Sequence, residues 1–279
     1  IPSFDPDNDP NGRVNTAWGM SFDRFTPEGV VFFMPYYMEK HKLNPEPARW
    51  FSAHFCFTLG QHCKEVQHDP EYYFHGEEIT LAVRSYTHGY DLFHPNKVIA
   101  YHEYTRKGRT KQWDDDSTWN DKNLFCHKKV RSLLNVDNEN EIKEEKYGLG
   151  TERTLQDYEL YAGIKFNDRS ITKQCKDNKP PPGDKDSLYY QEFKHAIGVN
   201  HKEFPKDDYT FCAIIFEDKE GNSLYREDFP GHLFNTKLKS AREGEEFIIW
   251  KTYQGPKPNK IILWACNEKG WQEKNIQNL

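Results

Sequence analysis

The sequence predicts an α/β domain followed by a small antiparallel β-domain. Strand-like runs at 29–38 and 97–104 flank a segment with helical spacing that begins at Glu77. A charged stretch at 173–186 with three consecutive prolines has the composition of a linker. Beyond it, short β-branched and aromatic runs separated by turn residues are typical of an antiparallel sandwich.

The first domain opens with loop chemistry and continues with buried strands. Residues 1–20 are rich in Asp, Asn, Pro and Gly, which favour turns. The runs GVVFFMPYYM at 29–38 and RWFSAHFCFTLG at 49–60 are short and rich in aromatic or β-branched residues, which predicts two strands. KVIAYHEY at 97–104 is a third strand candidate and carries His102 near its end.

A helix is predicted to start at Glu77 and to stop before Gly89. Its apolar residues recur at helical spacing, at Ile79, Val83 and Tyr86. Glu77 and Glu78 fall in the first turn, where the positive end of the helix dipole favours carboxylates. A second helix is expected after Thr151 or Thr154, each of which is a capping-box candidate.

These signals divide the chain into a first domain at 1–170, a linker at 171–186 and a β-domain at 187–279. Within the last part, the residues 220–222 form a turn signal between two strand-like runs, which predicts a hairpin. EEFIIWKTY and NKIILWACNEKGW supply two more strand-like runs.

Composition restricts the partners and the compartment. The chain has 38 basic and 44 acidic residues, a formal net charge of −6, so a nucleic-acid partner has no electrostatic support. No run approaches 18 apolar residues, so no membrane-spanning segment is expected. The six cysteines include no C-x-x-C pair and are widely scattered, which favours reduced thiols and a cytoplasmic setting.

Five motifs carry a family resemblance, in this order: ARWFSAHFCFTLG, DPEYYFHGEE, THGYDLFHP, YHEYTRKGRTKQWDDD and YGLGTERTLQDYELYAGI. They closely resemble the polypeptide N-acetylglucosaminyltransferases, which transfer GlcNAc to hydroxyproline or threonine in proteins. The resemblance implies a GT-A fold, a Rossmann-like α/β domain, with UDP-GlcNAc as donor, a polypeptide acceptor and Mn²⁺ or Mg²⁺ as cofactor. It covers the C-terminal part of such a catalytic domain, so an upstream polypeptide segment is expected to complete the nucleotide site.

A more distant likeness implies roles for particular residues. The mucin-type GalNAc transferases carry a Gly-Gly-Glu-Asn motif at a helix start and a histidine closely followed by arginine. Gly76-Glu77-Glu78 resembles the first motif, and His102 with Arg106 resembles the second. The likeness implies that Glu77 and Glu78 are catalytic residues facing the sugar and that His102 is a metal ligand. Residues 5–9 contain an Asp-x-Asp pattern. Because this pattern lies in a Pro- and Asn-rich loop, it is not assigned as the metal motif.

The chemistry of a departing diphosphate is consistent with these roles, because a divalent cation and basic side chains neutralise its charge. Arg106, Arg109 and Lys111 are therefore candidates for binding the diphosphate. Trp113 is a candidate for stacking on a sugar or the acceptor, with core packing as the alternative. The acids Asp114–Asp116 are either a solvated cap or ligands of a metal or the acceptor.

The histidines and the acids also have structural interpretations. His88 at a helix end and His94 before a proline are interpreted as structural. Simple helix-start acids are the alternative interpretation of Glu77 and Glu78, and it has more weight for Glu78 than for Glu77.

Three functions follow in order of support. The first is metal-dependent transfer of GlcNAc to a polypeptide hydroxyl. The second is a non-catalytic glycan- or protein-binding module, with a carbohydrate platform drawn from Tyr225, Trp250, Tyr253, Trp264 and Trp271. The third and weakest is a metal hydrolase built from Glu77, His88, His94 and His102, for which no H-E-x-x-H motif is present.

Overall fold

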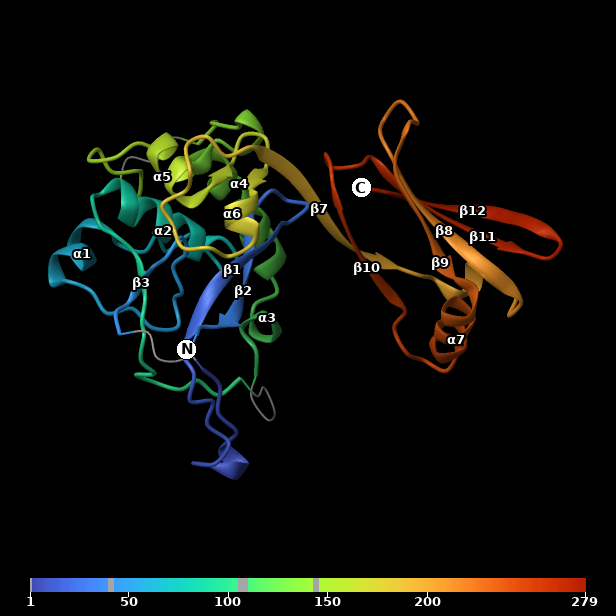
Figure 1. Cartoon of the computed structure of the whole chain (residues 1–279), viewed down its shortest axis with the longest axis horizontal. Helices are drawn as coiled ribbons and strands as arrows, with labels where there is room; N and C mark the ends of the chain where they lie inside the picture. Colours follow the sequence, from blue (N-terminus) through green and yellow to red (C-terminus); the bar gives the residue numbers. More distant parts are fainter. Residues whose placement is uncertain (1, 40–42, 105–109, 143–145) are drawn as a thin grey trace. The chain divides into compact units, whose positions relative to one another are not determined.

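A computed structural model describes residues 2–39, 43–104, 110–142 and 146–279, and the chain forms two compact units, 1–190 and 191–279 (Figure 1). The first unit is mixed α/β. Its elements are η1 (Pro6–Asn8), β1 (Trp18–Phe25), β2 (Val31–Tyr37), β3 (Glu46–Pro47), α1 (Gly60–Glu65), α2 (Glu77–Thr87), β4 (Phe93–His94), α3 (Gln112–Asp115), α4 (Trp119–Leu134), η2 (Val136–Asn138), α5 (Leu155–Ala162), β5 (Ile164–Lys165), β6 (Ser170–Thr172) and α6 (Lys173–Lys176).

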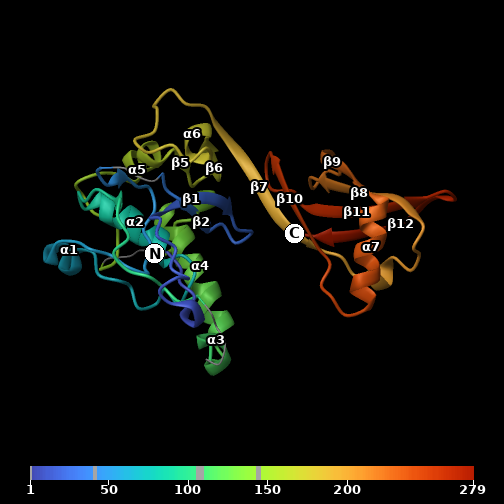
Figure 2. The same cartoon turned by 60° about the horizontal axis from the view of Figure 1, so that its bottom comes forward.

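The core of the first unit lies between the β1–β2 hairpin and the helices α2 and α4. The hairpin is antiparallel, with Trp18 opposite Tyr37, and it lies alongside α4 in both Figure 1 and Figure 2. Its inward side chains pack with apolar residues of both helices and of α5, a set that includes Phe22, Val31, Ile79, Val83, Val130 and Tyr158. Lys129 of α4 forms a buried ion pair with Asp69, with Nζ 2.5 Å from the carboxylate. The same Nζ lies 2.6 Å from the carboxylate of Glu71.

Helix α2 confirms the predicted start at Glu77 and owes that start to the preceding glycine. Gly76 has φ = +117°, in the left-handed region that favours glycine. A Cβ at this position would also lie only 2.5 Å from Cγ2 of Val130 on α4. Gly76 therefore permits both the turn into α2 and the close approach of α2 to α4.

Helix α5 also begins where the sequence predicts. Thr154 accepts a hydrogen bond from the Asp157 backbone N–H, and the Asp157 carboxylate accepts one from the Thr154 N–H. Gly163 ends this helix in the left-handed region.

Two predicted strands are wrong. Residues 49–59 form no strand, and within them Phe57 is 91% exposed and Leu59 71% exposed. Residues 97–104 contribute only an isolated bridge from His102 to Ser3, and Ile99 is 64% exposed. Both runs are apolar, but their side chains do not alternate between a core and solvent as those of a paired strand do.

The strand pairs of the first unit can be compared with the parallel sheet expected of a Rossmann-like domain. The pairs β1–β2, β3–β4 and β5–β6 are all antiparallel. The α/β class is confirmed, whereas these pairs do not show the parallel βαβ arrangement of a GT-A domain. Part of the expected linker is structured, since β6 and α6 place Ile171 and Cys175 in the core of this unit.

The second unit is a small antiparallel sandwich-like domain with one helix. Its elements are β7 (Tyr189–Gly198), which begins at the end of the first unit, η3 (His201–Glu203), β8 (Tyr209–Glu217), β9 (Ser223–Pro230), α7 (Gly231–Arg242), β10 (Ile248–Gln254), β11 (Lys260–Asn267) and β12 (Gly270–Asn278). A sheet in the order β12-β11-β8-β9 and the β7–β10 pair share one core with α7 (Figure 2). The predicted hairpin is confirmed, since β8 and β9 are joined by a turn that contains Gly221.

Gly76→Ala tests the approach of α2 to α4. The added Cβ meets Val130 and forces a non-glycine residue to positive φ, so we expect the free energy of unfolding to fall by about 1–3 kcal/mol. Gly60→Ala is the matched control, because no atom lies within 4 Å of its added Cβ. That variant should be neutral or gain less than about 1 kcal/mol. Urea unfolding monitored by circular dichroism compares the two, and equal effects would refute the role of Gly76.

Candidate functional site

The two predicted catalytic acids lie side by side in the first turn of α2. Both side chains are partly buried, and Glu78 accepts a hydrogen bond of 2.7 Å from the backbone N–H of Ala53. Glu77 is anchored through its backbone, whose carbonyl oxygen accepts from the Thr80 hydroxyl at 3.0 Å. The pair therefore stands at a fixed helix start beside the loop that contains Ala53.

Burial makes both carboxyl groups hard to ionise. Loss of solvation, reinforced by the neighbouring Glu78 charge, raises the pKa of Glu77 to about 7. Burial also raises the pKa of Glu78, against the opposing effect of the Ala53 N–H. A carboxyl group with a pKa near neutrality can both donate and accept a proton at physiological pH, which is a property of acid–base residues in active sites.

His102 lies on a loop that is tied to the N-terminal segment. Its backbone N–H donates to the Pro2 carbonyl oxygen at 3.0 Å, and its own carbonyl oxygen accepts from the Phe4 N–H at 3.4 Å. The half-buried ring has a buried Nδ1 without a hydrogen-bond partner. Its position near the end of a strand was predicted wrongly, but the loop leaves the imidazole nitrogen available.

Glu78 and His102 belong to one cluster, although they are far apart in the sequence. The ring of His54 lies 5.0 Å from that of His102, and the ring of Tyr104 lies 4.3 Å from it, measured between centroids. His54 follows Ala53, the residue that hydrogen-bonds Glu78. Burial and then the Glu78 charge raise the pKa of Tyr104, which places this phenol in the field of the carboxylate. We call Glu78, His54, His102 and Tyr104 the His102 cluster.

The His102 cluster has two solvent-exposed members and is backed by an aromatic ring. His54 and Tyr104 are exposed, and the Tyr104 ring stacks on Trp18 of β1 with centroids 6.2 Å apart. No sequence pattern singles out His54, Tyr104 or Trp18 as a member of this site. His54 and Tyr104 occur in motifs that carry the family resemblance, so membership of those motifs was the available signal.

The predicted basic and aromatic contacts are only partly described. Arg106 and Arg109 lie outside the described residues, as does the side chain of Trp113 on α3. Lys111 precedes α3, where its backbone N–H donates to the Asp114 carboxylate at 3.1 Å.

The acids that follow have capping roles. Asp116 accepts from the Thr118 N–H and pairs with Lys122 at 2.7 Å. The hydrogen bond from Lys122, followed by those from Thr118, lowers the pKa of Asp116 to about 2. Asp114 and Asp116 therefore have capping contacts, and binding of a metal or the acceptor by 114–116 stays a prediction.

The residues of the metal-hydrolase alternative do not form a site. His88 caps α2, with its Nδ1–H donating to the Arg84 carbonyl oxygen at 2.7 Å, so its structural interpretation is confirmed. His94 lies on β4, and the backbone N–H of Met20 donates to its Nε2 at 3.2 Å. Across the described ranges, no three His, Cys, Asp or Glu side chains come close enough to hold a metal ion. The described residues thus do not supply a complete ligand set for Mn²⁺ or Mg²⁺, and the role of His102 as a metal ligand stays a prediction.

The aromatic residues of the second unit do not form one surface. Tyr253 is buried in the core, and Tyr225 packs against that core. Trp264 and Trp271 lie instead on the opposite face of the sheet, stacked with centroids 4.1 Å apart. Lys274 Nζ lies 4.3 Å from the centroid of the Trp264 ring, and Arg226 Cζ lies 5.6 Å from the centroid of the Trp271 ring. The predicted five-residue platform is therefore wrong.

Comparison with known proteins identifies the family of the first unit. A family model described as glycosyltransferase (GlcNAc) matches residues 2–168, more than half of the chain. The chain belongs to this GlcNAc glycosyltransferase family, and its first unit therefore has a role in glycosyl transfer. No curated protein and no solved structure gives a significant match. In the described part of the chain, no helix has both the length and the apolar character needed to cross a membrane.

Glu77→Gln should alter stability in a pH-dependent way. Because the folded-state pKa is raised to about 7, the folded protein binds more protons than the unfolded chain between about pH 4.5 and 7. The contribution of the Glu77 carboxyl group to the stability of the wild type is therefore lost as the pH rises from about 4.5 to about 7. The variant lacks this loss, so it should match the wild type near pH 4 and exceed it by about 2–3 kcal/mol at pH 8.

Urea unfolding at both pH values measures this difference, with Glu246→Gln, at an exposed position, as the control. A difference between Glu77→Gln and wild type that stays constant from pH 4 to pH 8 would contradict the burial of this carboxyl group.

Proposed function

We propose that the protein transfers GlcNAc from UDP-GlcNAc to a hydroxyl group of a polypeptide, with a GT-A type of catalytic domain. The observation that carries the proposal is the convergence of Glu78 and His102 in one exposed cluster inside a glycosyltransferase domain. These are residues of the two motifs that resemble the sugar-binding and metal-binding motifs of related transferases. Their proximity is what a shared donor site requires.

Glu77 and Glu78 are assigned to the sugar. In the transfer, the bond between the anomeric carbon and the diphosphate oxygen breaks, and a bond from that carbon to the acceptor oxygen forms. The diphosphate leaves with the bonding electron pair, and the acceptor hydroxyl passes its proton to a base, a role assigned to ionised Glu77. With its pKa near 7, Glu77 can accept hydrogen bonds from sugar hydroxyls or take up a proton without a large cost at neutral pH.

His102 is assigned as one ligand of a divalent cation, Mn²⁺ or Mg²⁺. The support is its buried Nδ1 without a partner and the preference of Mn²⁺ for mixed oxygen and imidazole ligands. When bound, such a cation neutralises charge on the leaving diphosphate. Arg106, Arg109 and Lys111 remain proposed diphosphate contacts, and Trp113 a proposed sugar or acceptor contact. A cytoplasmic setting is proposed from the six cysteines, none of which is paired in a disulfide.

His102→Ala in the full-length protein tests the central assignment. We expect Mn²⁺ to bind at least tenfold more weakly, and transfer from UDP-GlcNAc to fall by about 10²–10⁴-fold. Calorimetric titration with Mn²⁺ and release of UDP measure the two effects. His232→Ala removes an exposed imidazole of α7 and should leave both unchanged. Unchanged Mn²⁺ affinity in His102→Ala would remove this residue from the metal site.

A further inference from the structure

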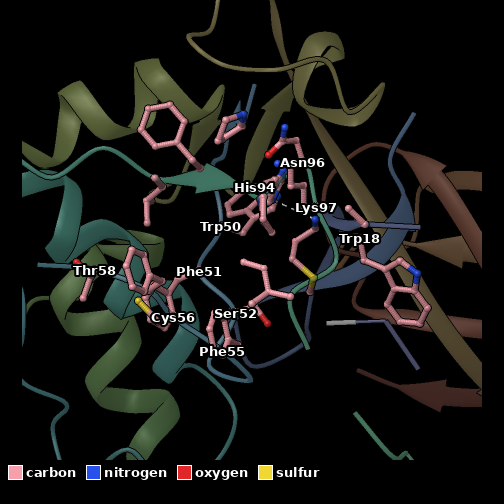
Figure 3. A pocket seen from close by; sticks show the side chains of 18 of the residues that line it. Trp18, Trp50, Phe51, Ser52, Phe55, Cys56, Thr58, His94, Asn96 and Lys97 are labelled. Atoms are coloured by element: carbon pink, nitrogen blue, oxygen red, sulfur yellow. Dashed lines mark hydrogen bonds between the residues drawn. The ribbon is translucent and has the colours of Figure 1, made fainter. Parts of the chain in front are cut away.

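The first unit contains a large, mainly apolar cavity beside the His102 cluster. Its volume is about 780 Å³, within the range of small-ligand pockets. Figure 3 shows side chains that surround it, among them Trp18, Trp50, Phe51 and His94. Trp18 also stacks on Tyr104, so the cavity and the His102 cluster share a wall.

His94 places an unused hydrogen-bond donor in the wall of this cavity. The side chain is 8% exposed, and its Nε2 accepts from the Met20 N–H at 3.2 Å. Burial, and then the charge of Arg49, lower the pKa of His94 to about 4, so the ring is neutral at physiological pH. A neutral imidazole whose Nε2 accepts must carry its proton on Nδ1. That Nδ1 is buried and has no partner in the described structure.

Arg49 adds a second unsatisfied donor near His94. This guanidinium is 4% exposed; its Nε donates to the Ala162 carbonyl oxygen at 2.6 Å, whereas its Nη2 has no partner. Buried donors without partners are costly, so the unpartnered Nδ1–H of His94 in the cavity wall points to an acceptor that is supplied from outside. An oxygen with lone pairs and no proton, such as a peptide carbonyl, satisfies such donors.

The charge of the cavity distinguishes between the possible occupants. The charged side chains in its wall are Asp91 and Lys97, one of each sign, and Asp91 is paired with Arg153. A nucleoside diphosphate requires several cations, which this wall does not offer. Exposed apolar side chains at the cavity, including Phe57 and Phe93, suit an apolar chain segment instead.

We propose that this cavity binds an apolar or aromatic segment of the acceptor polypeptide, with a backbone carbonyl of that segment accepting from His94 Nδ1–H. The proposal rests on the proposed function for the identity of the polypeptide as acceptor. Because the cavity shares Trp18 with the aromatic wall of the His102 cluster, a bound segment leads its neighbouring hydroxyl residue towards Glu78 and His102. The cavity thereby selects acceptors by the apolar residues beside the modified one.

His94→Gln isolates the proposed donor. A glutamine amide overlaps the Nε2 end of the imidazole, so it still accepts from the Met20 N–H but lacks the Nδ1–H. His94→Asn places an amide near the Nδ1 position and should restore part of the binding. His127→Gln is the matched control, because His127 is also a buried histidine of the first unit and lies outside the lining of the cavity.

The probes are two blocked peptides, acetyl-Ser-Phe-Pro-Thr-Phe-Ser-amide and acetyl-Ser-Gly-Ser-Thr-Gly-Ser-amide, titrated calorimetrically into the full-length protein without donor or metal. We expect the first to bind at least tenfold more tightly than the second. His94→Gln should lose about tenfold of that affinity, His94→Asn less, and His127→Gln none. Thermal unfolding of each variant verifies that it is folded.

Equal affinity for the two peptides, or an undiminished affinity in folded His94→Gln, would overturn the proposal. So would binding of UDP that is weakened by His94→Gln, since the cavity would then be a nucleotide site. Because these titrations contain no UDP-GlcNAc, they are separate from the transfer assay. Peptide binding with the expected pattern in a protein that transfers no sugar would support the cavity and contradict only the proposed reaction.

Discussion

At Gly76 the start of α2 lies so close to α4 that no β-carbon fits between them, and the backbone turns through positive φ at the same residue. This contact sets how deeply the first turn of α2 is buried. Glu77 and Glu78 follow immediately, and their raised pKa values result mainly from that burial. The same helix start places Glu78 against the backbone of Ala53, which brings His54 and hence His102 to the acids. The chemistry of the site thus depends on one glycine packed against Val130.

Loss of solvation shifts several ionisable groups of the first unit towards their neutral forms. It raises the pKa of the Glu77 carboxyl group and lowers the pKa of the His94 ring, so that both are less charged than in water. A neutral acid can donate as well as accept, and a neutral imidazole with one nitrogen occupied is a fixed donor at the other. Burial therefore influences which groups donate and which accept hydrogen bonds at the His102 cluster and in the neighbouring cavity. Burying these groups lowers the stability of the folded protein. This cost is consistent with a functional role, since buried polar groups without partners are rarely retained when they have no function.

Local signals made part of this structure predictable. The starts of α2 and α5 and the β8–β9 hairpin depend on a glycine, a capping box and a turn, which lie within a few residues of the elements they define. The runs at 49–60 and 97–104 were mistaken for strands because their apolar residues contribute to a cavity wall, which hydropathy cannot distinguish from a core. Resemblance identified Glu78 and His102, but their meeting through His54 requires the N-terminal segment to hold His102 in place. That contact joins Pro2 to a residue 100 positions later, and no periodicity encodes it.

The second unit bears on the choice between an enzyme and a binding module. A carbohydrate platform needs aromatic ring faces that a sugar can cover. Trp264 lies between Lys274 and Trp271, and Arg226 lies near the Trp271 ring, so these faces already have partners. This arrangement covers the small apolar patch of Ala213, Ile215 and Ile262 on that side of the sheet. The stacked tryptophans thus have a structural explanation, and the binding-module alternative loses the feature on which it depended. The antiparallel strands of the first unit do not by themselves indicate a function, so the argument for sugar transfer depends on the family and on the His102 cluster.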